Sequence, residues 1–194
     1  MPGIALPKTL SGYRPQDVGL LTHAALAIVA PALGTIPADR VAEYVLDVTG
    51  GLVNGTNVNR RRTLQQTAAG HVCTYLRRLA PSAPWRVLQA EFQTGFGRTD
   101  LAWTNPATGE MFFDELKTHK GALTGLSEEV FEQAKRQANG GDQEFSDQFL
   151  GVRVVPFGSL HLISMVTAAG ERVALNPTPD EPLRRRDESE GGAA

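Results

Sequence analysis

The apolar residues in the first part of the chain recur with the spacing of helices. They are dense in residues 15–33, as in a buried helix that Gly34 ends, and they return at steps of three and four in residues 38–48. Residues 57–79 carry a longer apolar stripe of the same period, which Pro81 follows. The pattern therefore predicts three helices before the first strand.

The period then falls to two, which is typical of strands. Strands are predicted in residues 85–93, 98–104 and 111–118, and the segments between them are rich in Gly, Asn and Pro, as in hairpin loops. One face of the first strand should carry its apolar side chains, which are Leu88, Ala90 and Phe92. The hairpin loops make these three strands antiparallel neighbours.

A fourth helix is predicted to begin after Ser127, a favourable N-cap residue, and to stop at the Asn-Gly-Gly of residues 139–141. Two more strands in residues 150–157 and 160–166, with a return in residues 172–175, complete the pattern. This order of elements favours an α/β fold in which a sheet is flanked by helices, and not a doubly wound nucleotide-binding fold.

The chain divides into three segments by composition. Residues 1–50 are expected to form a helical N-terminal extension, separated by the Gly- and Asn-rich joint of residues 50–57 from a core domain of residues 51–175. Residues 176–194 are rich in Pro, Arg and Glu, so we expect a disordered tail there.

The composition limits the classes of function. The net charge of -2 indicates that any contact with nucleic acid must come from a local basic patch, and the single Cys73 excludes an intrachain disulfide and a Cys-rich zinc site. Thr22, His23 and Pro31 interrupt the most apolar stretch, residues 19–33, which is too short to predict a membrane span. No secretory signal is recognised at the start, so a cytoplasmic protein is expected.

Asp100, Glu115 and Lys117 are charged residues that stand among apolar residues in the predicted strands. Glu115 and Lys117 point to the same face of their strand because side chains alternate, and the hairpin brings Asp100 beside Glu115. Asp114 should face away from Glu115, and we expect it to be a surface or edge charge. The alternative is that Asp100 lies in a turn and that Glu115 and Lys117 belong to a solvated strand face.

Two neighbouring carboxylates in an apolar setting repel one another, and a divalent cation would remove that repulsion. Mg²⁺ or Mn²⁺ takes oxygen ligands, so Asp100, Glu115 and the backbone carbonyl of Leu116 are the predicted ligands. Lys117 would orient or deprotonate the attacking water and offset charge growing on a phosphate. These residues contain the parts needed for hydrolysis of a phosphodiester bond.

The sequence frames GRTDLAW and FFDELKT, followed by a helix with glutamines, resemble the PD-(D/E)xK nuclease superfamily, which has the restriction-endonuclease-like fold. The resemblance covers residues 57–166 and rests on Asp100, Glu115 and Lys117. It implies a mixed β-sheet flanked by helices and a nuclease that depends on Mg²⁺ or Mn²⁺. The helical N-terminal segment matches nothing in this family.

The resemblance also implies two further members of the site. Glu91 occupies the place of an additional acidic residue and would be both a metal ligand and a catalytic residue, although it could instead be an exposed strand residue. In the helix after the Glu-x-Lys strand, Gln133 is preferred to Gln137 as the catalytic glutamine. Thr99 stands before Asp100 where the family often has proline.

The implied partner is nucleic acid, with DNA favoured over RNA, and the implied assemblies are a homodimer or a larger nucleoprotein complex; no membrane is expected. A rival hypothesis is a catalytically silent nucleic-acid-binding or assembly module on the same fold. A third hypothesis is a toxin or effector nuclease whose residues 1–50 serve a partner.

Other chemically capable side chains have simpler interpretations. The arginines of the third helix could bind phosphate or form a solvated helix face; they are Arg60, Arg61, Arg62, Arg77 and Arg78. His71 and Cys73 are expected to be packing residues, because no further metal-ligand partners are nearby. His119, which follows Lys117 closely, could approach a phosphate, but it is expected to be a loop residue. Ser159 and His161 lack the nucleophile elbow of a hydrolase.

Overall fold

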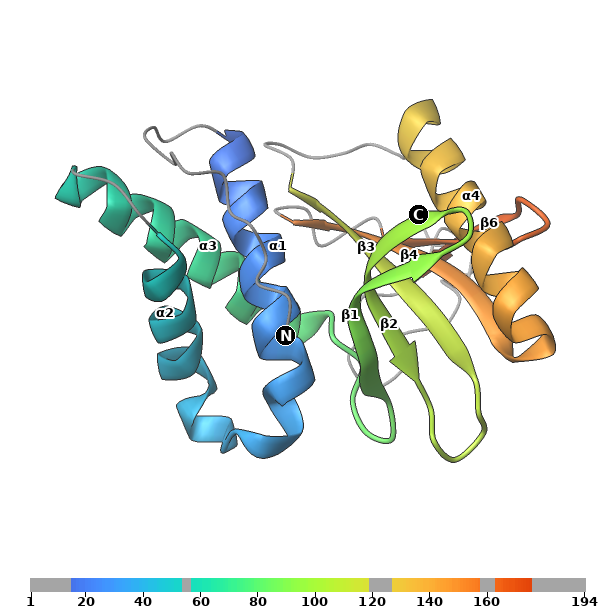
Figure 1. Ribbon diagram of the computed structural model, residues 1–194, viewed down its shortest axis with the longest axis horizontal. Helices are drawn as coiled ribbons and strands as arrows, with labels where there is room; N and C mark the ends of the chain where they lie inside the picture. The colour runs from blue at the N-terminus through green and yellow to red at the C-terminus, as the bar shows by residue number, and fades with distance from the viewer. Residues whose placement is uncertain (1–14, 54–56, 119–126, 158–162, 176–194) are drawn as a thin grey trace, which may run out of the picture.

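The computed structural model describes residues 15–53, 57–118, 127–157 and 163–175, and its fold is α/β with a six-stranded mixed sheet flanked by helices (Figure 1). The helices are α1 (Pro15–Ala32), α2 (Val41–Leu52), α3 (Val58–Arg78) and α4 (Glu128–Phe145). Short 3₁₀ turns occupy Leu33–Thr35, Ala38–Arg40 and Ser146–Gln148. The strands are β1 (Arg86–Thr94), β2 (Gly97–Thr104), β3 (Met111–Thr118), β4 (Phe149–Phe157), β5 (Ile163–Val166) and β6 (Arg172–Leu175).

The sheet follows the order of the sequence, β1 to β6. Neighbouring strands are antiparallel except β3 and β4, which are parallel. A parallel pair needs a crossover connection, and α4 is part of the segment that makes it. The first three strands are thus a meander, and α4 covers one face of the sheet beside it.

The two faces of the sheet pack against different helices. On one face, residues of α1, α2 and α3 form a large apolar cluster with Trp103, Phe112 and Leu116. On the other face, α4 packs against Phe113 and its neighbours on β4. Phe112 and Phe113, adjacent in β3, therefore enter opposite cores, as the strand period requires.

Helix α1 belongs to the core. By length and composition alone the segment 16–35 could cross a membrane, but half of that window is buried inside the protein, and core helices pass the same test. Leu21, Ala25, Leu26 and Val29 are fully buried. Residues before and after the predicted domain boundary share one apolar cluster. Helix α2 extends into the expected joint of residues 50–57 and ends at Leu52.

The prediction that the fourth helix stops at residues 139–141 is wrong, since α4 continues to Phe145. Its two glycines are sites of close packing and not a helix end. A Cβ on Gly140 would lie 2.4 Å from Oγ1 of Thr94, and a Cβ on Gly141 would lie 2.3 Å from the ring of Phe149. Tertiary contact therefore explains the glycine pair.

The prediction of one apolar face on β1 is also wrong. Leu88 lies in an irregular step of the β1–β2 register and is 48% exposed. Ala90 packs toward the α1–α3 side, whereas Phe92 belongs to the α4 side. Between them Glu91 has a φ of 52°, which interrupts the alternation of side chains.

Several predictions fall on residues outside those described. These are the roles of His119, Ser159 and His161, the first residues of the strand predicted at 160–166, and the tail of residues 176–194.

Candidate active site

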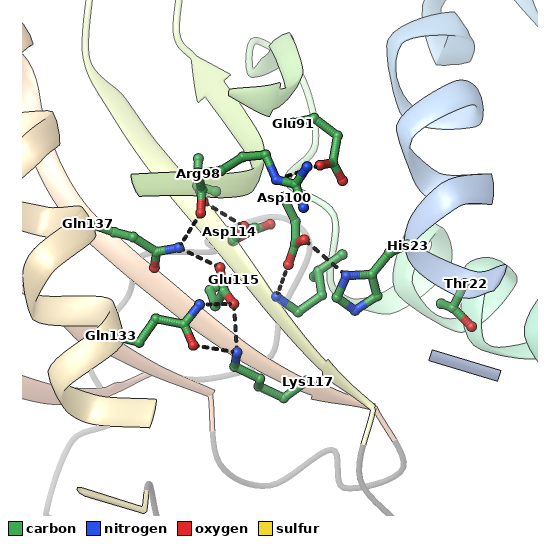
Figure 2. A network of polar contacts seen from close by, with 12 residues as sticks. Thr22, His23, Glu91, Arg98, Asp100, Asp114, Glu115, Lys117, Gln133 and Gln137 are labelled. Atoms are coloured by element: carbon green, nitrogen blue, oxygen red, sulfur yellow. Dashed lines mark hydrogen bonds and ion pairs between the residues drawn. The ribbon is translucent and has the colours of Figure 1, made fainter. Parts of the chain in front are cut away.

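Three carboxylates lie level with one another on three successive strands. Leu101 on β2 pairs with Asp114 on β3, so one residue earlier Asp100 comes opposite Glu115. The register of β1 against β2 likewise brings Glu91 opposite Asp100. Figure 2 shows these residues on the sheet between α1 and α4. The structure therefore brings together the acidic residues that the sequence singled out.

Glu115 is buried, with 5% of its surface exposed, and both of its oxygens accept hydrogen bonds. Oε1 accepts from Nζ of Lys117 at 2.6 Å and from Nε2 of Gln133 at 2.7 Å. Oε2 accepts from Nε2 of Gln137 at 2.7 Å. These three donors hold the carboxyl group of Glu115 in one orientation.

Gln137 joins three elements. Its Nε2 also donates to the backbone carbonyl of Arg98 at 2.7 Å, so α4 is tied to both β2 and β3. Rotating the amide by half a turn would place its oxygen against two acceptors, which fixes the orientation. Its Oε1 is buried and has no hydrogen-bond partner among the described residues.

The ammonium of Lys117 is only partly used by the protein. It donates to Oε1 of Glu115 and, at 2.8 Å, to Oε1 of Gln133. An ammonium has three N–H groups, so one of them has no acceptor among the residues that the structure describes. Gln133 thus contacts both Glu115 and Lys117.

Asp100 is held from two directions. Its Oδ2 accepts from the backbone N–H of Leu116 at 2.7 Å, and its Oδ1 lies 2.9 Å from Nδ1 of His23 on α1. The sequence did not predict His23 as a member of the site. A histidine within an apolar helix is unusual, but no local pattern connects His23 to Asp100, which lies 77 positions away.

The pKa of His23 is raised above its ordinary value of 6.5. Burial alone lowers it, but the hydrogen bond to Asp100 and the negative charges of Asp100 and Glu115 outweigh burial, while Lys117 opposes them. A protonated His23 therefore places a positive charge against Asp100.

Glu91 stands at the edge of this cluster. It forms an ion pair of 2.8 Å with Nε of Arg98. Burial raises the pKa of Glu91; Arg98 lowers it, and the charges of Asp100 and Glu115 raise it further. Its left-handed backbone conformation is the kind of local strain that collects at functional sites.

Asp114 was expected to be a surface or edge charge, and this is wrong. It does face away from Glu115, but α3 covers that side of β3 and leaves Asp114 fully buried. Nε and Nη2 of Arg153 each donate to it at 2.6 Å, and the hydroxyl of Tyr75 and Nε1 of Trp103 also donate to it. Asp114 and Arg153 are direct partners in the β3–β4 register.

The charges of this network stabilise each other. Burial lowers the pKa of Arg153, but the charge of Asp114 and its hydrogen bonds raise it above the ordinary value. Burial, and then the charge of Asp114, raise the pKa of the Tyr75 hydroxyl well above its usual range. The network is a structural support behind the strand that carries Glu115 and Lys117.

Carboxylate oxygens are the kind of ligand that a hard divalent cation takes. Among the described residues, no group of three or more His, Cys, Asp or Glu side chains is arranged to hold a metal ion. A carboxylate has about four lone-pair positions. Asp100 shares an oxygen with His23 and accepts one backbone hydrogen bond, so it keeps acceptor capacity that a cation could use.

The residues that sequence reasoning assigned to packing lie away from this cluster. Cys73 is half-buried and packs against the α1–α3 core, and burial raises the pKa of its thiol. Burial lowers the pKa of His71.

No protein-family model, no curated protein and no solved structure matches this chain.

Proposed function

We propose that this protein is a metal-dependent nuclease of the PD-(D/E)xK type, with DNA favoured over RNA as its substrate. The observation that carries the proposal is the position of Asp100 level with Glu115 on neighbouring strands, with Lys117 bound to Glu115. Two carboxylates and one ammonium in this arrangement suit hydrolysis of a phosphodiester bond.

The order of the elements supports a restriction-endonuclease-like fold. A helix precedes three antiparallel strands, a second helix follows the Glu-x-Lys strand, and the next strand returns parallel to it. The acidic residue and the Glu-x-Lys pair occupy the second and third strands of the meander, as in the resemblance.

Asp100 and Glu115 would hold Mg²⁺ or Mn²⁺, with Glu91 and the backbone carbonyl of Leu116 as further ligands. When bound, the cation would polarise the scissile phosphate and lower the pKa of a bound water. The N–H of Leu116 and the ring of His23 orient Asp100 for this task.

Lys117 would act as a donor. Because its ammonium already donates to Glu115 and Gln133, it is placed to orient a water molecule and to offset charge on the phosphate. Gln133 and Gln137 are positioning residues, since both hold Glu115.

The test is a cleavage assay on labelled single-stranded and duplex DNA and RNA, with Mg²⁺, with Mn²⁺ or with EDTA. We expect cleavage only with a divalent ion, and Lys117→Ala should lower kcat by about 100-fold or more. Lys135→Ala, on α4, makes the same change in charge and should cut like the wild type. Normal cutting by a folded Lys117→Ala variant would refute the mechanism.

The second candidate is a catalytically silent nucleic-acid-binding or assembly module. It is favoured by the absence of a preformed cage among the described residues and by the donors that occupy both oxygens of Glu115. Calorimetric titration with Mn²⁺ separates the two functions. Binding to the wild type that Asp100→Asn removes supports the nuclease, whereas no binding to the wild type supports the module.

A further inference from the structure

Helix α3 concentrates positive charge in a chain whose net charge is -2. It carries arginines near both ends and no acidic residue. The proposed cleavage site uses none of them. The exposed arginines give the surface of this helix a positive electrostatic potential.

Arg61 and Arg62, together with Gln65, line a groove of about 270 Å³ at the junction of α2 and α3. The rest of the lining is apolar or glycine, namely Gly50, Val53 and Val58. No acidic residue is among these, so the groove presents two guanidinium groups without a neutralising carboxylate.

The floor of the groove is fixed by close packing of α2 on α3. A Cβ on Gly50 would lie 2.8 Å from Nε2 of Gln65, so glycine is what allows the two helices to approach there. The same Nε2 donates to the backbone carbonyl of Leu46 at 2.9 Å. The amide is thereby held in place at the groove, and its second N–H has no acceptor among the described residues.

The two guanidinium groups are unengaged within the part of the chain that the structure describes. Arg61 and Arg62 are exposed, and neither makes an ion pair or side-chain hydrogen bond with a described residue. Guanidinium groups match the geometry of phosphate oxygens with paired hydrogen bonds. The first turn of α3, which has no acidic residue, adds to the positive potential.

We propose that this groove binds a backbone phosphate of the nucleic acid, at a second contact away from the cleavage site. The proposal rests on the nuclease function proposed above for its substrate class. In Figure 1 the α2–α3 junction and the N-terminal ends of α1 and α4 lie along the same upper side of the molecule.

The experiment measures binding of a fluorescein-labelled DNA oligonucleotide by anisotropy in EDTA, over a series of salt concentrations. The variant is Arg61→Ala/Arg62→Ala. The matched control is Arg77→Ala/Arg78→Ala, which removes the same charge from the other, equally exposed end of α3. Circular dichroism checks that both variants are folded.

We expect the groove variant to weaken binding about tenfold or more and to reduce the salt slope by about one, for the one lost phosphate. The control should change affinity less than about twofold if it loses only long-range attraction. Equal losses in the two variants, or no loss in either, would overturn the groove as a specific site.

The readout is independent of catalysis. If the wild type binds DNA through the groove and never cuts it with any metal, the nuclease proposal fails and the groove remains. If the wild type cuts DNA while the groove variant binds like the control, the groove fails and the nuclease remains.

Discussion

At the residue scale, the contact between His23 and Asp100 joins a titratable imidazole to a carboxylate of the site. The charged groups that influence His23 are Asp100 and Glu115, which favour its protonation, and Lys117, which opposes it. Because the folded pKa lies above the ordinary value of 6.5, protonated His23 stabilises the folded state. That contribution is fully present below pH 6.5 and is lost as pH rises through the raised pKa.

His23→Asn should remove this dependence on pH. The amide of asparagine can still donate to Asp100, but it carries no titrating proton. We expect the free energy of unfolding of the wild type to fall by about 1 kcal/mol, relative to the variant, as pH rises from below 6.5 through the raised pKa. Urea denaturation at several pH values measures it, and parallel curves for the two proteins would contradict it.

The buried pair of Asp114 and Arg153 leads to a second prediction. Asp114→Asn leaves the guanidinium of Arg153 in the core without a counter-charge, so the free energy of unfolding should fall by about 3–5 kcal/mol. Asp142→Asn makes the same chemical change at an exposed position of α4 and should shift stability by less than about 0.5 kcal/mol. Denaturant titration of both variants compares them, and equal effects would show that the network contributes little.

At the element scale, a glycine of α4 should respond to substitution by alanine in the opposite way to most helix glycines. Glycine to alanine in a helix interior usually stabilises, because alanine has the higher helix propensity. At Gly141 the new Cβ would meet the ring of Phe149, so Gly141→Ala should destabilise by about 1–3 kcal/mol. In α3, Gly70 has nothing within 4 Å among the described atoms, so Gly70→Ala should stabilise by about 0.5–1 kcal/mol.

The thermal unfolding midpoint should therefore fall for Gly141→Ala and rise for Gly70→Ala, relative to the wild type. A rise for both variants would mean that α4 can shift away from β4 without loss. A fall for both would mean that the exposed face of α3 is more constrained than its surroundings indicate.

The same glycines illustrate what the sequence could and could not predict about the elements. Hydrophobic period located the helices and strands, because each element buries one face or both. The period failed where tertiary contact or local backbone conformation determined the structure. Thr94 and Phe149 explain the two glycines of α4, and the conformation of Glu91 changes which core receives Phe92. Asp114 was misplaced for the same reason, since the period gives its direction but not the helix that covers it.

The residues of the site also differ in whether the sequence could predict their contacts. Asp100 and Glu115 could be paired from the sequence because a hairpin connects their strands and sets their register. His23 could not, because its contact depends on how α1 packs against the sheet. Local pattern predicts what adjacent strands bring together, whereas helix docking requires the folded molecule.

At the scale of the whole molecule, the N-terminal helices and the sheet share one core. Leu21, Leu26, Val29 and Val45 are almost fully buried. Burying four such side chains contributes roughly 6–12 kcal/mol in total, which is comparable with the entire net stability of a typical domain.

Deletion of residues 1–50 should therefore unfold the protein and abolish nuclease activity. The truncated chain should lack a cooperative unfolding transition by circular dichroism, and the full-length chain is the reference. A truncated protein that unfolds cooperatively and still cuts DNA would show that the remaining residues form an independent domain.

The backbone amide of Leu116 donates to a side chain, Oδ2 of Asp100, from within a central strand. Its proton therefore senses the electron density on that oxygen directly. In an NMR spectrum, a cation that draws charge from Asp100 should change the chemical shift of this amide and its rate of hydrogen exchange. One resonance would then report how Asp100 is engaged in the intact protein, before any nucleic acid is added.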